Sequence, residues 1–248
     1  MKALVFRVLA LGFFVYWGMN TIAMDLTINH VFAQDKVTQE LLEVLTQLGK
    51  TSGSYRADIT SIVQGRKGAT YYTKGKFKFK WPRMLWQKNW RVKDNTLLGI
   101  SISNGKFKWL YVPRVNAVLK YNKKAIDEDS QEKGWFSADV IDKASVQFVG
   151  KENIGREEVY VFEVEPSALL KHENPDPPGK SRFYIGVKDG IMRKMISYNP
   201  QGLETGSQIY TNIQLDDSIT AKDFEFIPPD GTQIHEVMGV GSRTNQNP

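Results

Sequence analysis

The chain has 248 residues, with 33 Lys and Arg against 27 Asp and Glu, and a formal net charge of +6. This basic excess is small, so charge alone does not require a polyanionic partner. There is no cysteine, which excludes disulfides, cysteine-ligated metals and lipid attachment to a cysteine of the chain itself.

The N-terminal residues 1–33 have the pattern of a secretory signal peptide. A short basic start precedes the apolar run VLALGFFVYWGM at residues 8–19, and small residues follow it. The run is shorter than the ~20 residues needed to cross a bilayer. We expect cleavage after Ala23 or after Ala33, with an uncleaved membrane anchor as the alternative.

After the signal peptide the sequence predicts a single domain over 34–238 and a flexible tail over 239–248. An amphipathic helix is expected at Asp35–Lys50, where apolar residues recur at helical spacing and Gly49 stands where a C-cap would end it. From Gly53 onward, apolar and polar residues alternate with a period of two, which is typical of half-buried strands. The strands predicted from this alternation are Ser54–Gln64, Thr70–Trp81, Met84–Val92, Leu97–Ser103, Lys106–Val112, Ala117–Tyr121, Ser145–Lys151, Glu158–Glu165, Arg182–Val187, Ile191–Asn199 and Leu203–Leu215, with Phe224–Phe226 as a candidate for a last short strand.

A charged insert at 122–144 interrupts the strands and is expected to form one or two short helices. An antiparallel sheet of about 11 strands tends to curl. The fold class expected is therefore mainly β with an α lid: an unclosed antiparallel β-barrel of about 11 strands covered by short helices.

Several strands in the first half carry large apolar residues on one face and polar or cationic residues on the other. Phe77, Phe79 and Trp81 alternate with lysines, and side chains on a strand point to opposite faces with a period of two. If the apolar faces of successive strands coincide, they line a hydrophobic cavity, since barrels with many strands enclose ligand sites. The alternative is that the rings fill an ordinary core.

Catalytic and metal-binding patterns are scarce. The three histidines, His30, His172 and His235, are scattered, and no pair has the spacing of metal ligands. We therefore expect neither an enzyme nor a metal or cofactor site. Nucleic acid is also not expected, because platforms for single strands present rings and cations on the same face.

Three segments resemble the periplasmic outer-membrane lipoprotein carrier family (LolA-like). They are GKFKFKWPRMLW at 75–86, SNGKFKWLYVP at 103–113 and DFEFIPPDGTQI at 223–234, of which the third is the most specific. The likeness covers essentially the whole chain after the signal peptide. The chain departs from the family in having Trp81 before the proline, where the family commonly has an arginine linked to lid behaviour, and Trp86 stands one residue early.

The resemblance implies a hydrophobic cavity, closed by a helical lid, that holds the acyl chains of lipoproteins in the periplasm. Such carriers accept a lipoprotein from an inner-membrane ABC transporter and pass it to an outer-membrane receptor, so these partners are implied, with the protein itself a monomer. The residues expected to line the cavity are Phe77, Phe79, Trp81, Trp86, Ile100, Phe107, Trp109, Tyr111 and Leu119. The residues expected in the lid are Leu41, Leu45, Trp135 and Phe136.

The alternative function is an envelope sensor or protein-interaction module of the same architecture. It would bind a protein partner through a cationic outer face. The residues expected on that face are Lys76, Lys78, Lys80, Lys106 and Lys108.

Overall fold

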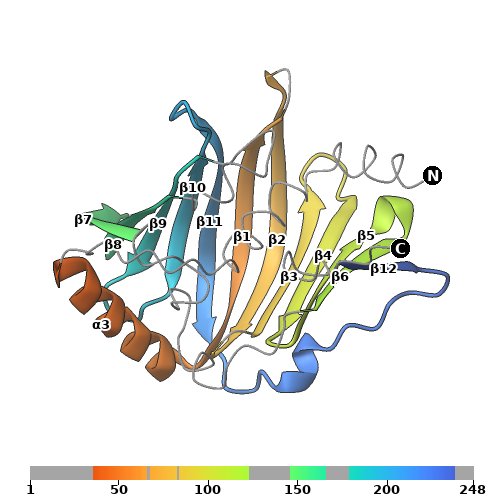
Figure 1. Cartoon of the computed structure of the whole chain (residues 1–248), viewed down its shortest axis with the longest axis horizontal. Helices are drawn as coiled ribbons and strands as arrows, with labels where there is room; N and C mark the ends of the chain where they lie inside the picture. The colour runs from red at the N-terminus through yellow and green to blue at the C-terminus, as the bar shows by residue number, and fades with distance from the viewer. Residues whose placement is uncertain (1–35, 66–67, 83, 123–145, 166–178, 238–248) are drawn as a thin grey trace, which may run out of the picture.

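The computed structural model describes residues 36–65, 68–82, 84–122, 146–165 and 179–237. In this part of the chain one α-helix, α3 (Lys36–Ser52), accompanies one sheet of 12 strands (Figure 1). The strands are β1 (Ser54–Gln64), β2 (Thr70–Lys80), β3 (Met84–Arg91), β4 (Leu97–Asn104), β5 (Phe107–Val112), β6 (Ala117–Asn122), β7 (Val146–Ile154), β8 (Glu157–Val164), β9 (Ser181–Gly186), β10 (Met192–Tyr198), β11 (Glu204–Leu215) and β12 (Gln233–Val237).

The strand order in the sheet is β12-β6-β5-β4-β3-β2-β1-β11-β10-β9-β8-β7. Strands β1 to β6 form one meander and β7 to β11 form a second, and the two join where β1 pairs with β11. All neighbours pair antiparallel except β12 and β6, which are parallel. Because β12 and β7 do not meet, the sheet is not closed, and the expectation of an unclosed antiparallel barrel is confirmed.

The eleven strands predicted from alternation are all present, with ends that differ by a few residues at most. The candidate strand at Phe224–Phe226 is wrong: a 3₁₀ helix, η6 (Ala221–Phe224), ends there, and the chain runs on irregularly. The true last strand, β12, was not predicted. The signal peptide, the helices expected at 122–144 and the tail lie outside the described residues.

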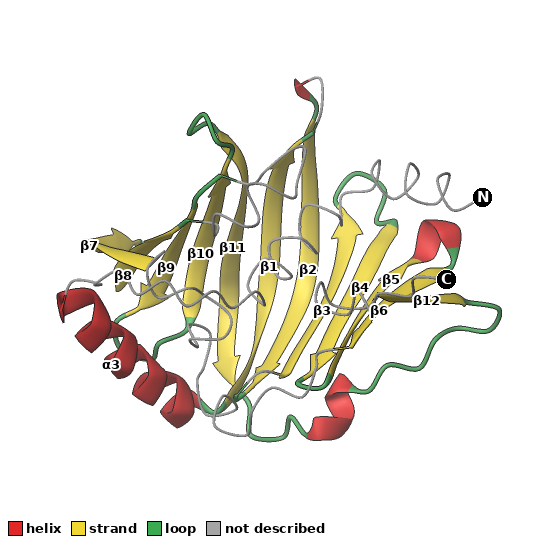
Figure 2. Ribbon diagram, viewed as in Figure 1, coloured by secondary structure: helices red, strands yellow, loops and turns green. Residues whose placement is uncertain are grey.

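The sheet has two faces, which we name by what covers them. The helix face carries Phe77 and is covered by α3. The strap face carries Lys78 and is covered by the irregular segment after β11, residues 216–227, which we call the strap. Side chains from β2 and from β7, which lie far apart in the sheet, belong to one cluster under α3. The sheet therefore curves toward the helix face, as the ribbon in Figure 2 shows.

Helix α3 and β1 are joined by one tight turn. Gly53 adopts φ +60°, a left-handed conformation that favours glycine, and its N–H donates to the Gly49 carbonyl at 3.2 Å. The Trp81 N–H donates to the Gly53 carbonyl at 2.7 Å, which fixes the turn against the end of β2. The C-terminal end of α3 is thus attached to the sheet through a single glycine.

Candidate functional site

The candidate site is the apolar cluster between α3 and the helix face of the sheet. The leucines of α3 recur at helical spacing, and Leu45 is buried while Leu41, Leu42 and Leu48 are half-buried against the strands. Beneath them lie Phe77 and other buried side chains from both meanders. These are Tyr55, Ala57, Ile59, Phe79, Val146, Phe162, Val164, Phe183, Ile185, Ile191, Met192 and Tyr210.

The rings of this helix-face cluster touch one another. The ring centroids of Tyr55 and Phe79 are 5.3 Å apart, and those of Phe77 and Tyr210 meet edge to face at 5.3 Å. On the β7–β8 side, Phe148 and Phe162 are 5.5 Å apart. These separations are those of packed aromatic pairs, so with α3 in this position the rings form a packed core.

Polar groups border the cluster on the helix face. The Tyr210 hydroxyl donates to Gln208 Oε1 at 2.6 Å, and Gln208 Nε2 donates to Ser61 Oγ at 3.2 Å. All three residues are buried, and burial raises the pKa of the Tyr210 hydroxyl well above its ordinary value. This hydroxyl therefore stays protonated and the ring remains a neutral part of the wall.

Two side-chain hydrogen bonds hold α3 onto the sheet. Near its start, Thr38 Oγ1 accepts from the Phe148 N–H at 3.1 Å, and at its end Ser52 Oγ donates to the Asp189 carbonyl at 2.7 Å. The first bond also caps a backbone group on the edge strand β7, which would otherwise be free to pair with another chain. Leucine contacts thus hold the middle of the helix, and these two polar anchors stand near its ends.

Of the residues expected to line a cavity, Trp81 and Leu119 lie on the helix face with Phe77 and Phe79. Trp81 packs against the helix-face cluster, and a Cβ placed on Gly49 would stand 2.7 Å from its ring. Leu119 lies opposite Leu110 in the register and shares the face of Phe77, farther along the sheet. Trp135 and Phe136, the other predicted lid residues, lie outside the described residues.

The predicted cavity lining is wrong in one respect, because five of its residues lie on the opposite face of the sheet. In the β2–β3 pairing Phe77 stands opposite Gln87, whereas Trp86 stands opposite Lys78. Directly opposed residues share a face, so the apolar side of β3 is the strap face. The β3–β4 and β4–β5 pairings place the apolar sides of β4 and β5 on the strap face as well. The residues moved to the strap face are Trp86, Ile100, Phe107, Trp109 and Tyr111.

The strap packs on four of these side chains: Trp86, Ile100, Trp109 and Tyr111. Phe224 and Ile219 are buried there against Ile102, and Phe226 packs beside them, 6.1 Å from the Tyr111 ring between centroids. The conspicuous sequence DFEFIPP therefore supplies the rings that cover the second apolar face. Nothing in the periodicity of the sequence signalled this strap, because irregular backbone has no period.

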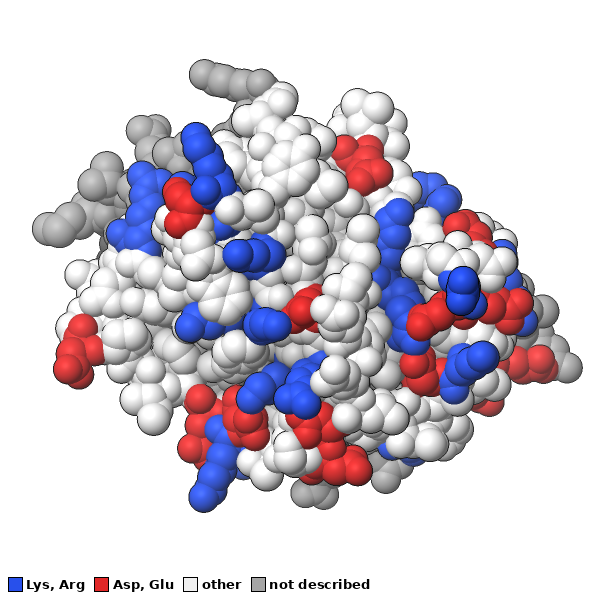
Figure 3. Space-filling view, turned by 180° about the vertical axis from the view of Figure 1, so that it is seen from behind, with Lys and Arg blue, Asp and Glu red and all other residues white. Residues whose placement is uncertain are grey.

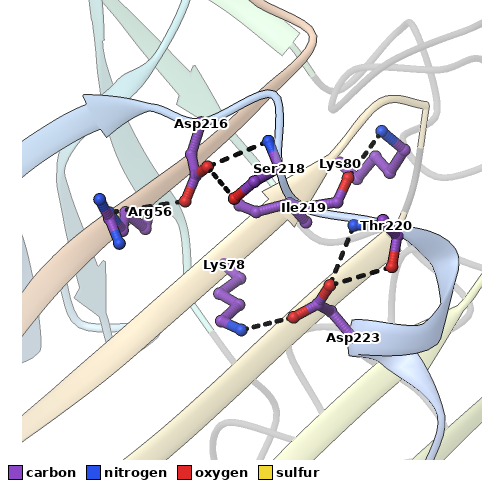
Figure 4. Close-up of polar contacts among 8 residues, drawn as sticks. All are labelled: Arg56, Lys78, Lys80, Asp216, Ser218, Ile219, Thr220 and Asp223. Atoms are coloured by element: carbon purple, nitrogen blue, oxygen red, sulfur yellow. Dashed lines mark hydrogen bonds and ion pairs between the residues drawn. The ribbon is translucent and has the colours of Figure 1, made fainter.

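The lysine row of β2 fastens the strap (Figure 4). Lys78 Nζ lies 2.6 Å from Asp223 Oδ1, and Lys80 Nζ donates to the Ile219 carbonyl at 3.0 Å. The hydrogen bond from Lys78, followed by that from the Thr220 N–H, lowers the pKa of the Asp223 carboxyl. Arg56 adds a looser contact of 3.6 Å with Asp216.

The expected cationic outer face is correspondingly reduced. Lys78 and Lys80 hold the strap, and Lys76 Nζ lies 2.6 Å from Asp58 Oδ1. Lys108 stands opposite Ser103 on the helix face and is buried, so its placement on the cationic face is wrong. Lys106 lies in the β4–β5 turn and is exposed. The five lysines do not form one open surface.

Within the described residues, no group of three or more His, Asp and Glu side chains could hold a metal ion. No helix in the same part of the chain is long and apolar enough to cross a membrane.

Comparison with solved structures finds the same architecture elsewhere. An uncharacterised conserved protein from Thermus thermophilus matches with a TM-score of 0.55 at 10% identity, over 82% of this chain and 100% of that one. At that identity the match shows the fold alone. No protein-family model and no curated protein matches the sequence.

Two further similar structures come from other bacteria. The LolA superfamily protein NE2245 from Nitrosomonas europaea has a TM-score of 0.39 at 12% identity and covers 76% of this chain and 97% of its own. The MucA/MucB complex of Pseudomonas aeruginosa contributes a chain with a TM-score of 0.44 at 8% identity, over 77% of this chain and 61% of that one. Scores below 0.5 are too low to carry an argument about function.

Proposed function

We propose that this protein is a periplasmic carrier that binds the acyl chains of lipoproteins, or of a similar lipid, between α3 and the rings of the helix face. The observation that carries the proposal is the way α3 is held. Leucines pack it on aromatic side chains, one glycine joins it to β1, and two side-chain hydrogen bonds fix it near its ends.

The free energy gained by burying an acyl chain and the free energy needed to lift α3 off the sheet are of similar size. Burying a methylene is worth about 0.8 kcal/mol, so an acyl chain of roughly 16 carbons gains on the order of 10 kcal/mol when it leaves water. Lifting α3 exposes four leucines, of which three are only half-buried. At about 1.5–3 kcal/mol for each fully buried side chain, and half of that for a half-buried one, exposing these leucines costs roughly 4–8 kcal/mol. Such a balance gives binding that can be reversed, as a carrier requires.

The transport route is part of the same proposal. The resemblance to lipoprotein carriers, and the signal peptide expected at the N-terminus, support export and transfer from the inner to the outer membrane. An ABC transporter and an outer-membrane receptor are then the partners, and the carrier works as a monomer without enzymatic activity. Since three of the five lysines expected on a cationic face already have partners within the chain, we favour the carrier over the sensor.

An engineered disulfide provides a reversible test. An ideal Cβ on Gly190 would stand 2.9 Å from Leu48 Cβ and 3.2 Å from the Gly49 nitrogen, which is closer than the ~3.8 Å between Cβ atoms in a disulfide. Gly190 also has φ +67°, so a cysteine there strains the turn and shifts it outward, toward the separation of a disulfide. The comparison is therefore made between the oxidised and reduced states of the same double variant. The chain has no other cysteine. The double variant Leu48→Cys/Gly190→Cys should bind a fluorescent fatty-acyl probe when reduced and lose at least about tenfold in affinity when oxidised.

The single variants Leu48→Cys and Gly190→Cys are the controls, and neither should respond to oxidant. Circular dichroism of the two redox states establishes that the fold is retained. If the oxidised and reduced double variants bind the probe equally, α3 is not a lid. If neither these proteins nor the wild type binds it, the helix-face cluster is an ordinary core.

A further inference from the structure

Three turns gather at the end of the sheet away from the α3–β1 junction (Figures 1 and 2). They connect β1 to β2, β3 to β4 and β10 to β11. The Val92 N–H donates to the Tyr72 carbonyl at 3.1 Å, and Val63 stands between Tyr71 and Gly206 in the register. The three turns are therefore neighbours and form one rim, which we call the turn end.

The turn end exposes large apolar side chains. Tyr71, Tyr72, Val92 and Leu203 are 44%, 54%, 50% and 66% exposed. Single exposed apolar residues are ordinary, whereas several at one end of a molecule mark an interaction site. Tyrosine in particular favours the boundary between water and a bilayer, because its ring is apolar and its hydroxyl is polar.

Lysines lie directly behind these side chains on the strap face. Lys74 follows Tyr72 by two residues and is exposed, and Lys76 stands directly opposite Lys88 across β2 and β3. Opposed like charges destabilise a sheet. In the described part of the chain, no acidic side chain pairs with Lys74 or Lys88, and Lys88 Nζ lies 5.3 Å from the centre of the Trp90 ring.

Few acidic side chains lie near the turn end in the described part of the chain. Asp58 is bound by Lys76, and Asp94 is bound by Arg91 at 2.9 Å, while Glu204 is exposed beside Leu203. Figure 3, which views the strap face, shows lysine and arginine side chains spread over its middle, with acidic side chains gathered mainly along the lower edge and to the right. The surface behind the rim is therefore cationic.

We propose that the turn end docks on the surface of an anionic lipid bilayer. The order of side chains from the tip inward matches the order of layers in such a surface, with acyl chains beneath anionic headgroups. Apolar and tyrosine side chains stand at the tip, and Lys74 lies about 7 Å behind Tyr72 along the extended strand. An interfacial segment places its apolar face about 5–10 Å into the headgroup boundary, so the lysines would meet anionic headgroups, each adding attraction.

An acidic peptide is a less suitable occupant, because it would use the lysines and leave the exposed tip residues in water. Docking by the turn end would also leave α3, with its attachment at the opposite end of β1, free to move. This surface is separate from the helix-face cluster, so membrane docking and acyl-chain binding can be tested independently.

The test is cosedimentation of the wild-type protein with vesicles of phosphatidylglycerol and phosphatidylcholine, compared with vesicles of phosphatidylcholine alone. We expect binding to the anionic vesicles that weakens as salt is raised. Leu203→Ser should reduce binding several-fold. Leu215→Ser is its matched control, because Leu215 is 63% exposed at the opposite end of the same strand, and it should have no effect.

The contribution of the lysines is tested with the double variant Lys74→Glu/Lys88→Glu. The control is Lys188→Glu, because Lys188 lies in the β9–β10 turn at the other end of the sheet. The double variant should lose about tenfold or more in binding to anionic vesicles, and the control should lose little. Absence of vesicle binding, equal effects of test and control variants, or binding to soluble polyglutamate without vesicle binding each overturns the proposal. Affinity for the fatty-acyl probe should be unchanged in all these variants.

Discussion

Removing the Phe224 ring should detach the strap from the sheet. Phe224 has no exposed surface and packs against Ile102 and Ile219 on the strap face. Replacing a buried phenylalanine with alanine costs about 3–5 kcal/mol. The salt bridge between Lys78 and Asp223 is partly exposed, and pairs of that kind contribute about 0.2–1 kcal/mol. The ring, not the ion pair, should therefore dominate the attachment.

Hydrogen exchange measured by mass spectrometry is the direct assay for this loss. In Phe224→Ala, peptides from 216–237 should exchange about 100-fold faster, since about 3 kcal/mol corresponds to that factor. Peptides from β8 and β9 should keep their protection. Ile227→Ala is the control, because Ile227 lies in the same segment and is 85% exposed. If both variants exchange alike, the ring does not anchor the strap and our account of the strap face is wrong.

Three other perturbations have defined outcomes. Because its lysine partner lowers the pKa of Asp223 from 3.8, the stabilisation is present above that value and lost as the pH falls through the folded pKa. Asp223→Asn should therefore weaken strap protection at pH 7 and differ less from the wild type as the pH drops below about 4. Thr38→Val removes the acceptor of the Phe148 N–H, and urea unfolding should show a loss of about 1 kcal/mol; an unchanged midpoint would mean that this bond contributes nothing. Gly75→Ala places a Cβ 2.8 Å from the Lys88 carbonyl oxygen, so a loss of about 1–3 kcal/mol is expected, and a neutral result would contradict the close approach of β2 and β3.

The sequence was sufficient to predict eleven of the twelve strands in the described sheet, and which residues alternate within each. Period-two alternation survives in nearly every strand because each one has a buried side and a wetter side. The helix α3 was equally readable from its leucines and from the glycine near its end. These signals are local, and the structure confirms them.

The sequence was not sufficient to predict which strands present the same face. That relation depends on the register across each turn, where a shift of one residue moves every side chain to the other face. Lys80 pairs with Met84 across the β2–β3 turn, so Trp86 falls beside Lys78 and not beside Phe77. The aromatic sides of β2 and β3 consequently point in opposite directions, and one predicted cavity became two apolar faces.

The members of the helix-face cluster that come from the second half of the chain were also missed. Phe162, Phe183 and Tyr210 lie more than 80 residues from Phe77 in the sequence, and β1 pairs with β11 to bring them near. No local pattern specifies that pairing. It follows from the joining of two meanders into one sheet.

The central claim is that an acyl chain lies between α3 and the rings beneath it. Photo-crosslinking with a diazirine-bearing fatty acid, followed by peptide mapping, tests this most directly. Adducts should fall on α3 and on the strands that carry Phe79 and Phe183, and excess unlabelled fatty acid should suppress them. Adducts on the strap or on Trp109 and Tyr111 alone, or none that unlabelled fatty acid suppresses, would contradict the claim.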